Sequence, residues 1–387
     1  MKSYAKRLFR HFDFPLFFTY LVLCLFGLIM IYSSSMVWAV NRYGWEPDKF
    51  FNQQLASVFI AIPAFFVTAF LPYKLYRKKY FMMFSVALML ILLGLVHVIG
   101  FGGAVGSQSW INLPIGSLQP SELAKIVMVI YFAGVFANKY DAGTINSINT
   151  AIVPPVIILG IAVASVMSET DIGATFIIIA VSLCVMATSG INIKTFGKLS
   201  VFVAGILVLV AIFLYFSWES VMTESRLGRF TAYKDPFKYI QGSGLQIVNG
   251  YIAIGAGGLF GLGLGNSVQK MGYLPEPHTD FIMAIISEEL GIFGTTIVIG
   301  GLGFLVIRAF MIALKTRDPH ARMLASGIGA LIGIQTFVNL GGLTGLIPLT
   351  GVTLPFISYG GTSIILLSLA LGILMNVSMF TRYEKNK

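Results

Sequence analysis

Long apolar runs recur along the whole chain, and they exclude a fold built around an ordinary water-exposed surface. The runs extend from residue 14 to residue 380, with no polar block large enough to fold independently. A bilayer core of about 30 Å needs about 20 apolar residues in a helix that satisfies its own backbone hydrogen bonds. We therefore predict a single all-α integral membrane domain over residues 1–387, a polytopic bundle with about ten transmembrane helices: 14–36, 55–71, 80–101, 121–137, 151–167, 171–189, 199–217, 281–307, 322–345 and 359–380.

The charge pattern argues for membrane topology and against a nucleic-acid partner. Only 11% of the residues are charged, against about 25% in soluble domains. The formal net charge is +10, but the 26 Lys and Arg residues form short clusters between apolar runs instead of a stripe on one face. The two cysteines, Cys24 and Cys184, lie within apolar runs, so neither a disulfide framework nor a thiolate metal site is expected.

Lys and Arg also predict the orientation, because cytoplasmic loops are enriched in them. With the N-terminus inside, 18 of them lie in cytoplasmic segments and only Arg42 and Lys49 lie in short outer loops. The first run follows a basic tail and lacks a convincing cleavage site, so we expect it to remain as an anchor. The prediction is a multi-pass protein of a cytoplasmic membrane with both termini inside and a long outer loop, 218–280, between helices 7 and 8.

The long loop contains a Gly-rich apolar stretch, 244–265, that is too interrupted to be a confident full span. Non-helical backbone at membrane depth persists only where protein or a water-filled cavity covers it. We expect a re-entrant or interfacial segment that lines a cavity.

Ionisable residues at the outer ends of the predicted spans are candidate functional groups, because such residues are costly in a membrane. Glu122 and Lys125 are three residues apart and share a helix face, where they form either a substrate-binding pair or a structural ion pair. Glu169 and Asp171 lie in a tight hairpin at the outer surface, and Asp171 alternatively caps the helix that follows.

Cations are concentrated in the outer loop, most clearly at Arg226, Arg229 and Lys270. A guanidinium group matches the oxygens of phosphate and pyrophosphate, so the two arginines are candidate clamps for a phosphorylated lipid. The alternative is nonspecific binding to anionic membrane headgroups.

The stretch 261–291 has the highest density of candidate site residues. Its three glycines at 261, 263 and 265 lack the preceding strand and following helix of a dinucleotide site, so close backbone packing is the better interpretation. Asp280 precedes an apolar helix and is either its N-cap or a catalytic carboxylate that shares one outer mouth with His278 and the cations.

Two further acids, Glu288 and Glu289, lie about 12–13 Å deeper than Asp280 if the helix is straight. At that depth they need partners, and Lys125 or a polar cavity is expected. A Gly- and Pro-rich stretch at 339–363 lies between the last two spans; it either lines the site, with Ser358 as a substrate contact, or merely turns the chain.

Seven segments of the chain form one recognisable pattern. They are GLIMIYSSS (27–35), FFNQQ (50–54), WINLPIGSLQPSELAK (110–125), ETDIGAT (169–175), the stretch of Arg226 and Arg229 with Asp235 and Pro236, GLGLGNSVQKMGYLPEPHTDFIMAIISEELG (261–291), and NLGGLTGLIPLTGVTLPFISYGGTS (339–363). Together they resemble the SEDS family, the shape, elongation, division and sporulation proteins that include FtsW, RodA and SpoVE. GNSVQK before YLPE is more similar to the FtsW and SpoVE branch than to RodA.

The resemblance implies a ten-helix glycosyltransferase of the bacterial cytoplasmic membrane that polymerises lipid II, with an undecaprenyl-linked glycan and membrane lipids as ligands. A class B penicillin-binding protein is the implied partner. The family's essential aspartate corresponds to Asp280. Two positions depart from the family pattern: Gln108-Ser109 replace the usual basic residues before Trp110, and Thr170 replaces a frequent proline.

Such a polymerisation needs a base but no general acid, because the pyrophosphate leaves without a proton. We assign Asp280 as this base; Arg226, Arg229 and Lys270 are candidates to neutralise charge on the leaving group. A divalent cation, Mg²⁺ or Mn²⁺, bound by Asp280 is the competing role. A lipid II flippase is the alternative function, and a catalytically silent scaffold is a third that leaves the outer site unexplained.

Overall fold

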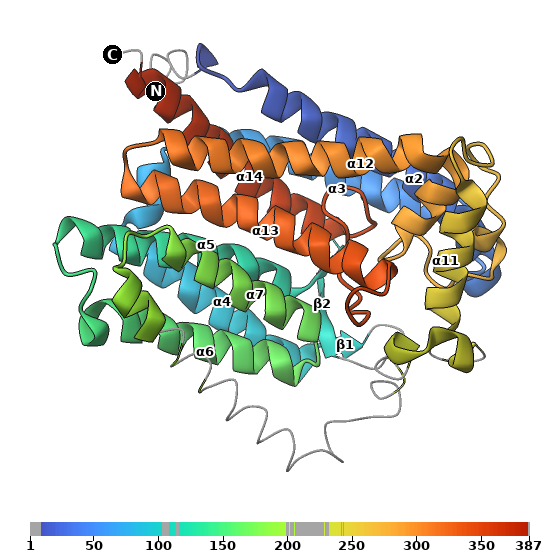
Figure 1. Ribbon diagram of the computed structural model, residues 1–387, viewed down its shortest axis with the longest axis horizontal. Helices are drawn as coiled ribbons and strands as arrows, with labels where there is room; N and C mark the ends of the chain where they lie inside the picture. Colours follow the sequence, from blue (N-terminus) through green and yellow to red (C-terminus); the bar gives the residue numbers. More distant parts are fainter. Residues whose placement is uncertain are drawn as a thin grey trace.

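The computed structural model describes residues 9–102, 108–113, 116–198, 201, 205, 228, 232–240, 242 and 244–385. Within these residues the chain is mainly helical, and its longer helices run side by side in one bundle (Figure 1). The helices are α2 (Phe14–Tyr43), α3 (Lys49–Phe70), α4 (Lys79–Ile99), α5 (Pro120–Asp141), α6 (Val153–Ser168), α7 (Ile172–Ala187), α11 (Leu245–Gly257), α12 (Ile282–Lys315), α13 (Pro319–Leu343) and α14 (Gly361–Lys385).

Eight helical stretches in the described residues are long and apolar enough to cross a membrane. They match eight of the predicted spans, and one of them includes both a π-helical turn at Ile148–Ile152 and α6. The predicted span 171–189 corresponds to α7, which is apolar but has only 16 residues. The predicted span 199–217 lies almost entirely outside the described residues.

The helices approach one another closely where small residues replace large ones, as expected in lipid. The clearest example is Gly372 of α14, where a Cβ atom would lie 2.0 Å from Thr68 Oγ1 on α3. At this point Thr68 donates a hydrogen bond to the carbonyl oxygen of Leu369 at 2.9 Å. Helices α5, α13 and α14 have the largest buried shares of the candidate spans, so they form the centre of the bundle.

A small antiparallel sheet departs from the all-α prediction. It consists of β1 (Phe101–Gly102), β2 (Gln108–Leu113) and β3 (Gly116–Leu118), in the order β1-β2-β3. The strands follow the end of α4 and lead directly into α5, beginning at Pro120. Their side chains are too few to stabilise a sheet alone, so the ends of the surrounding helices must support it.

Helix α12 is broken at Gly291, whose backbone angles (φ 60°, ψ −148°) are not helical. The Gly-rich stretch after α11 fills this break: the amides of Leu262 and Gly263 donate to the carbonyl oxygens of Glu288 and Glu289, each at 2.9 Å. A Cβ atom at Gly291 would lie 2.5 Å from a backbone oxygen, so this interlock requires glycine. The expected close backbone packing is confirmed at Gly261, where a Cβ atom would lie 2.2 Å from the Glu289 carbonyl oxygen, and it is wrong for Gly265, where nothing lies within 4 Å.

Both ends of the described chain meet at one end of the bundle. Asp13, fully buried before α2, accepts hydrogen bonds from Arg308 of α12 at 3.0 and 3.1 Å, and it forms an ion pair with Arg382 of α14 at 2.8 Å. Helix α11 lies at the opposite end, across the bundle (Figure 1). The candidate site is built at that opposite end.

Candidate active site

Asp280 lies where four parts of the fold meet. Its carboxylate accepts hydrogen bonds from Thr279 at 3.1 Å and, at 3.5 Å, from Gln246 of α11. Asn339 of α13 donates to the backbone oxygen of Asp280 at 2.9 Å and to that of Val352 at 2.7 Å. Asp280 is partly exposed, and its carboxylate is held by hydrogen bonds from Thr279 and Gln246.

The alternative role of Asp280 as a helix N-cap is wrong. Helix α12 begins at Ile282, and Phe281, not Asp280, occupies the cap position. Glu276, four residues before Asp280, adopts a rare conformation with φ 44°. Such conformations persist only where the surroundings enforce them, and they are frequent at functional sites.

His278 is buried beside Asp280 and is uncharged. Its ring centroid lies 4.2 Å from that of Phe50 and 5.5 Å from that of Tyr359, and the amide of Tyr359 donates to the His278 backbone oxygen at 2.9 Å. Burial lowers the pKa of His278 to about 3. The imidazole therefore adds no positive charge to the site, although its role in substrate binding stays a prediction.

Ser358 makes a local bond within the loop before α14. Its hydroxyl oxygen accepts a hydrogen bond from the Leu354 amide at 2.8 Å, and the residue is buried. This geometry explains how the loop is shaped, and it gives no support to the predicted substrate contact.

Glu122 and Lys125 form an ion pair at 2.8 Å on the buried face of α5, as their spacing predicts. Lys125 also donates to the Gln335 side chain of α13 at 3.0 Å, and Ser363 of α14 donates to Glu122 at 3.2 Å. The pair therefore joins three central helices. The predicted structural ion pair between Glu122 and Lys125 is confirmed. Binding of substrate by these two residues stays a prediction.

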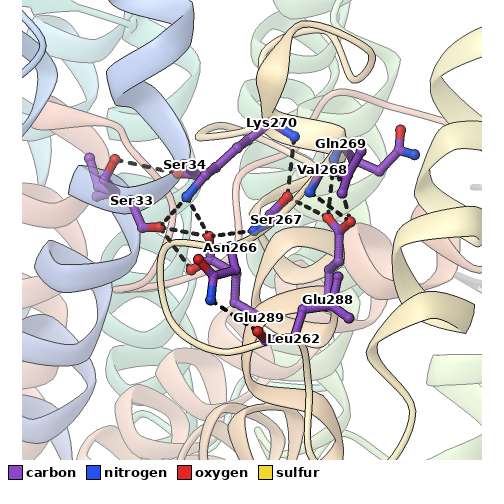
Figure 2. Close-up of polar contacts among 11 residues, drawn as sticks. Ser33, Ser34, Leu262, Asn266, Ser267, Val268, Gln269, Lys270, Glu288 and Glu289 are labelled. Carbon is purple, nitrogen blue, oxygen red and sulfur yellow. Dashed lines mark hydrogen bonds and ion pairs between the residues drawn. The ribbon is translucent and has the colours of Figure 1, made fainter.

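Lys270, and not Lys125, is the ion-pair partner of Glu289, the second of the two buried acids near the end of the half-helix 282–290. Its ammonium forms an ion pair with Glu289 at 2.7 Å and donates to Ser33 of α2 at 3.0 Å (Figure 2). The side chains of Lys270 and Glu289 are almost completely buried. The expected pairing with Lys125 is wrong, and Lys270 is not an open cation at the mouth of the site.

Glu288 is satisfied mainly by backbone. It accepts hydrogen bonds from the amides of Val268 and Gln269 and from the hydroxyl of Ser267 (Figure 2). Because α12 breaks at Gly291, the depth expected from one straight helix does not apply to Glu288 and Glu289. Together the two acids fasten the segment that leads to Asp280 onto the first half of α12.

Asp171 caps α7, as its position before the helix suggested. Its carboxylate accepts a hydrogen bond from the Ala174 amide at 2.8 Å and a second from Gln119 at 3.1 Å. Thr170 before it has φ 70°, a value that proline cannot adopt. The turn at position 170 therefore excludes proline, which explains why this chain departs from the family's frequent residue there.

Glu169 is buried in this turn, and neither of its carboxylate oxygens has a partner in the described residues. Burial, and secondly the charge of Asp171, raises its pKa to about 8. Because the folded state holds this proton more tightly than the unfolded state, the raised pKa of Glu169 stabilises the fold. The stabilisation is complete below 4.5, the pKa of the unfolded state, and is lost as the pH rises through about 8.

We expect Glu169→Gln to remove this loss, because glutamine is neutral at every pH. The variant should melt near the wild-type temperature at pH 5 and a few degrees above it at pH 9. Thermal melting in detergent over this range is the measurement, with the exposed Glu384→Gln as the control. Equal melting temperatures at pH 9 would show that Glu169 is not a buried acid.

Sequence reasoning missed several residues that position Asp280. Gln246 and Asn339 are single polar residues inside apolar stretches, which was the available signal. Arg226 and Arg229 lie outside the described residues, so their predicted role as pyrophosphate clamps stays a prediction.

Comparisons with known proteins agree on one family. The family model described as "Cell cycle protein", which covers FtsW, RodA and SpoVE, matches residues 14–383. A probable peptidoglycan glycosyltransferase FtsW of Bacillus subtilis (strain 168) is 45% identical over 99% of this chain and 94% of its own length. The stage V sporulation protein E of the same organism is 37% identical over 94% of this chain and 96% of its own length.

Solved structures share the fold. The rod shape determining protein RodA of Thermus thermophilus matches with a TM-score of 0.66 and 23% identity, over 95% of this chain and 96% of its own. A chain from "Structural coordination of polymerization and crosslinking by a peptidoglycan synthase complex" matches with a TM-score of 0.73 and 23% identity, over 96% of this chain and 98% of its own. This chain is a polytopic membrane protein that belongs to the FtsW, RodA and SpoVE family, the SEDS proteins.

Proposed function

We propose that this chain is a peptidoglycan glycosyltransferase that polymerises lipid II at the outer face of the cytoplasmic membrane, in division, sporulation or cell shape. The observation that carries the proposal is the partly exposed Asp280, whose carboxylate is held by Thr279 and Gln246 and which is not the cap residue of α12. The relative that is 45% identical is named a probable peptidoglycan glycosyltransferase, which supports the same assignment.

In the proposed reaction the 4-hydroxyl oxygen of one sugar bonds to the anomeric carbon of another. The bond from that carbon to the lipid pyrophosphate breaks, and its electron pair leaves with the pyrophosphate. Asp280 accepts the hydroxyl proton. Burial and, secondly, the neighbouring charge of Asp280 raise the pKa of Glu276.

Arg226 and Arg229 are the proposed clamps of the pyrophosphate. A Mg²⁺ or Mn²⁺ ion fits the donor chemistry, because such ions bind through one or two carboxylates together with substrate phosphates. No cluster of three or more metal-binding side chains occurs in the described part of the chain, so Asp280 would hold the ion jointly with the pyrophosphate. When bound, the cation would supply charge stabilisation for the leaving group.

Incubation of the purified chain and its partner with labelled lipid II, followed by separation of the products by length, tests the proposal. Glycan strands longer than the starting disaccharide are expected. The proposed partner is a class B penicillin-binding protein that cross-links the product. Lipid II that remains unpolymerised under conditions in which the complex is intact would refute the activity.

We propose that both termini face the cytoplasm. The contact of Asp13 with Arg382 places the two ends together, and the Lys and Arg distribution favours the inside for that end. In a chain whose Cys24 and Cys184 are replaced, a cysteine at position 234 should react with an impermeant thiol reagent in intact cells. A cysteine at position 384 should react only after permeabilisation, and the reverse pattern would show the opposite orientation.

A lipid II flippase remains the second candidate, since transporters also use broken helices. The break at Gly291 is the feature that favours it. Against it, the neighbouring acids are engaged by Lys270, Ser267 and backbone amides, and the Gly-rich stretch fills the break. Translocation of labelled lipid II in proteoliposomes, measured with and without polymerisation, separates the two functions.

A further inference from the structure

Five aromatic side chains form a continuous series of ring contacts. The series runs from Tyr43, at the end of α2, to His278, two residues before Asp280. Their centroids are 4.5 Å apart between Tyr43 and Trp45, 5.7 Å between Trp45 and Phe50, and 4.2 Å between Phe50 and His278. Tyr359 completes the group, 5.1 Å from Phe50. We call these five residues the aromatic wall.

The wall changes from open to buried along its length. Tyr43 and Trp45 are 44% and 42% exposed, whereas Phe50 is 7% and His278 is 3% exposed. Gly44, with φ 64°, ends α2 and turns the chain so that the two outer rings stack on each other. A ligand could therefore contact the outer rings while its reacting end lies near Asp280.

The inner end of the wall is held rigidly by the FFNQQ motif, which the catalytic assignment leaves unexplained. The Tyr359 hydroxyl donates to Gln53 at 2.7 Å, and the Gly360 amide donates to Gln54 at 3.1 Å. Asn52 donates to Asp48 at 2.8 Å in the same first turns of α3, where the pair is exposed. Polar amides and a carboxylate thus border the rings.

This combination suits a saccharide. A pyranose ring has a C–H face, which is attracted to the negative face of an aromatic ring, and a rim of hydroxyl and amide groups that hydrogen-bond to side chains. We propose that the aromatic wall binds the sugar units of the lipid-linked substrate or growing glycan next to Asp280. The inference rests on the proposed function and assigns a binding role to the wall.

The competing explanation is that Tyr43 and Trp45 belong to the aromatic belt that anchors helices at a membrane surface. A belt residue needs no contact with a catalytic segment, whereas the wall is continuous with His278 through Phe50. The two explanations differ in whether a soluble sugar binds.

The test is the affinity of the full chain in lipid nanodiscs for chitotetraose, a soluble β-1,4-linked N-acetylglucosamine tetramer, by calorimetry. One aromatic contact is worth about 1 kcal/mol, so Trp45→Ala should weaken binding by about fivefold. Trp45→Phe should retain most of the affinity. Tyr80→Ala, at an 86% exposed aromatic far from the wall in sequence, is the matched control and should bind like wild type.

Unchanged affinity in Trp45→Ala, or no binding by the wild-type chain, would overturn the inference and leave the membrane belt as the explanation. Melting temperatures of the variants verify folding. Polymerisation of lipid II is assayed in parallel. If the wild-type protein is active and Trp45→Ala binds the sugar as the wild type does, only the binding role of the aromatic wall is refuted. If the wild-type protein is inactive, the proposed function is refuted. A raised KM with little change in kcat is the expected kinetic effect of Trp45→Ala.

Discussion

Asp280→Asn is expected to reduce lipid II polymerisation by about 10²–10⁴-fold, the usual contribution of a general base. Asparagine keeps the size of the side chain, and its oxygen can still accept hydrogen bonds from Thr279 and Gln246. The backbone oxygen that Asn339 binds is unchanged. We therefore expect a folded protein that has lost its proton acceptor or its cation ligand.

Strand synthesis is measured together with the melting temperature and co-purification of the partner. Asp141→Asn, at the exposed last residue of α5, is the matched control and should remain active. Normal synthesis by Asp280→Asn would contradict the assignment and return attention to the flippase candidate. Synthesis that is lost together with folding in Asp280→Asn but not in Asp280→Glu would indicate a structural role.

Lys270→Ala is expected to destabilise the protein by about 3–5 kcal/mol, because it leaves the fully buried Glu289 without its counter-ion. The change also removes a hydrogen bond to Ser33, so α2 loses one of its contacts with the segment that carries Asp280. Thermal melting in detergent is the measurement. Lys238→Ala, at an exposed lysine of the same segment, 218–280, should leave the melting temperature unchanged.

The double variant Lys270→Met with Glu289→Gln distinguishes loss of the ion pair from loss of packing. It removes both charges and retains most of the volume, so it should recover a large part of the lost stability. If Lys270→Ala melts like Lys238→Ala, the cluster in Figure 2 does not stabilise the fold. If the double variant is as unstable as the single one, shape and not charge pairing is the cause.

The sequence was sufficient for the helices, because span length and hydrophobicity are local properties. Eight predicted spans correspond to long apolar helices, with ends that differ by several residues at Tyr43 and Lys315, and the i,i+3 spacing of Glu122 and Lys125 was enough to predict their contact. The cap at Asp171 was also predictable, because capping involves only neighbouring residues. The small sheet was not predicted, since its strands are short and depend on adjacent helix ends.

Only the tertiary structure decided which distant residues meet at the site. Lys270 could have paired with any outer acid by sequence alone; it pairs with Glu289 because the Gly-rich stretch fills the break at Gly291 and brings the two side chains together. The position of Asp280 just before an apolar helix left a helix cap open as its alternative role, and the helix starts two residues later, at Ile282. Such contacts depend on backbone geometry between segments far apart in the chain, whereas hydropathy and spacing report only on residues within one helix.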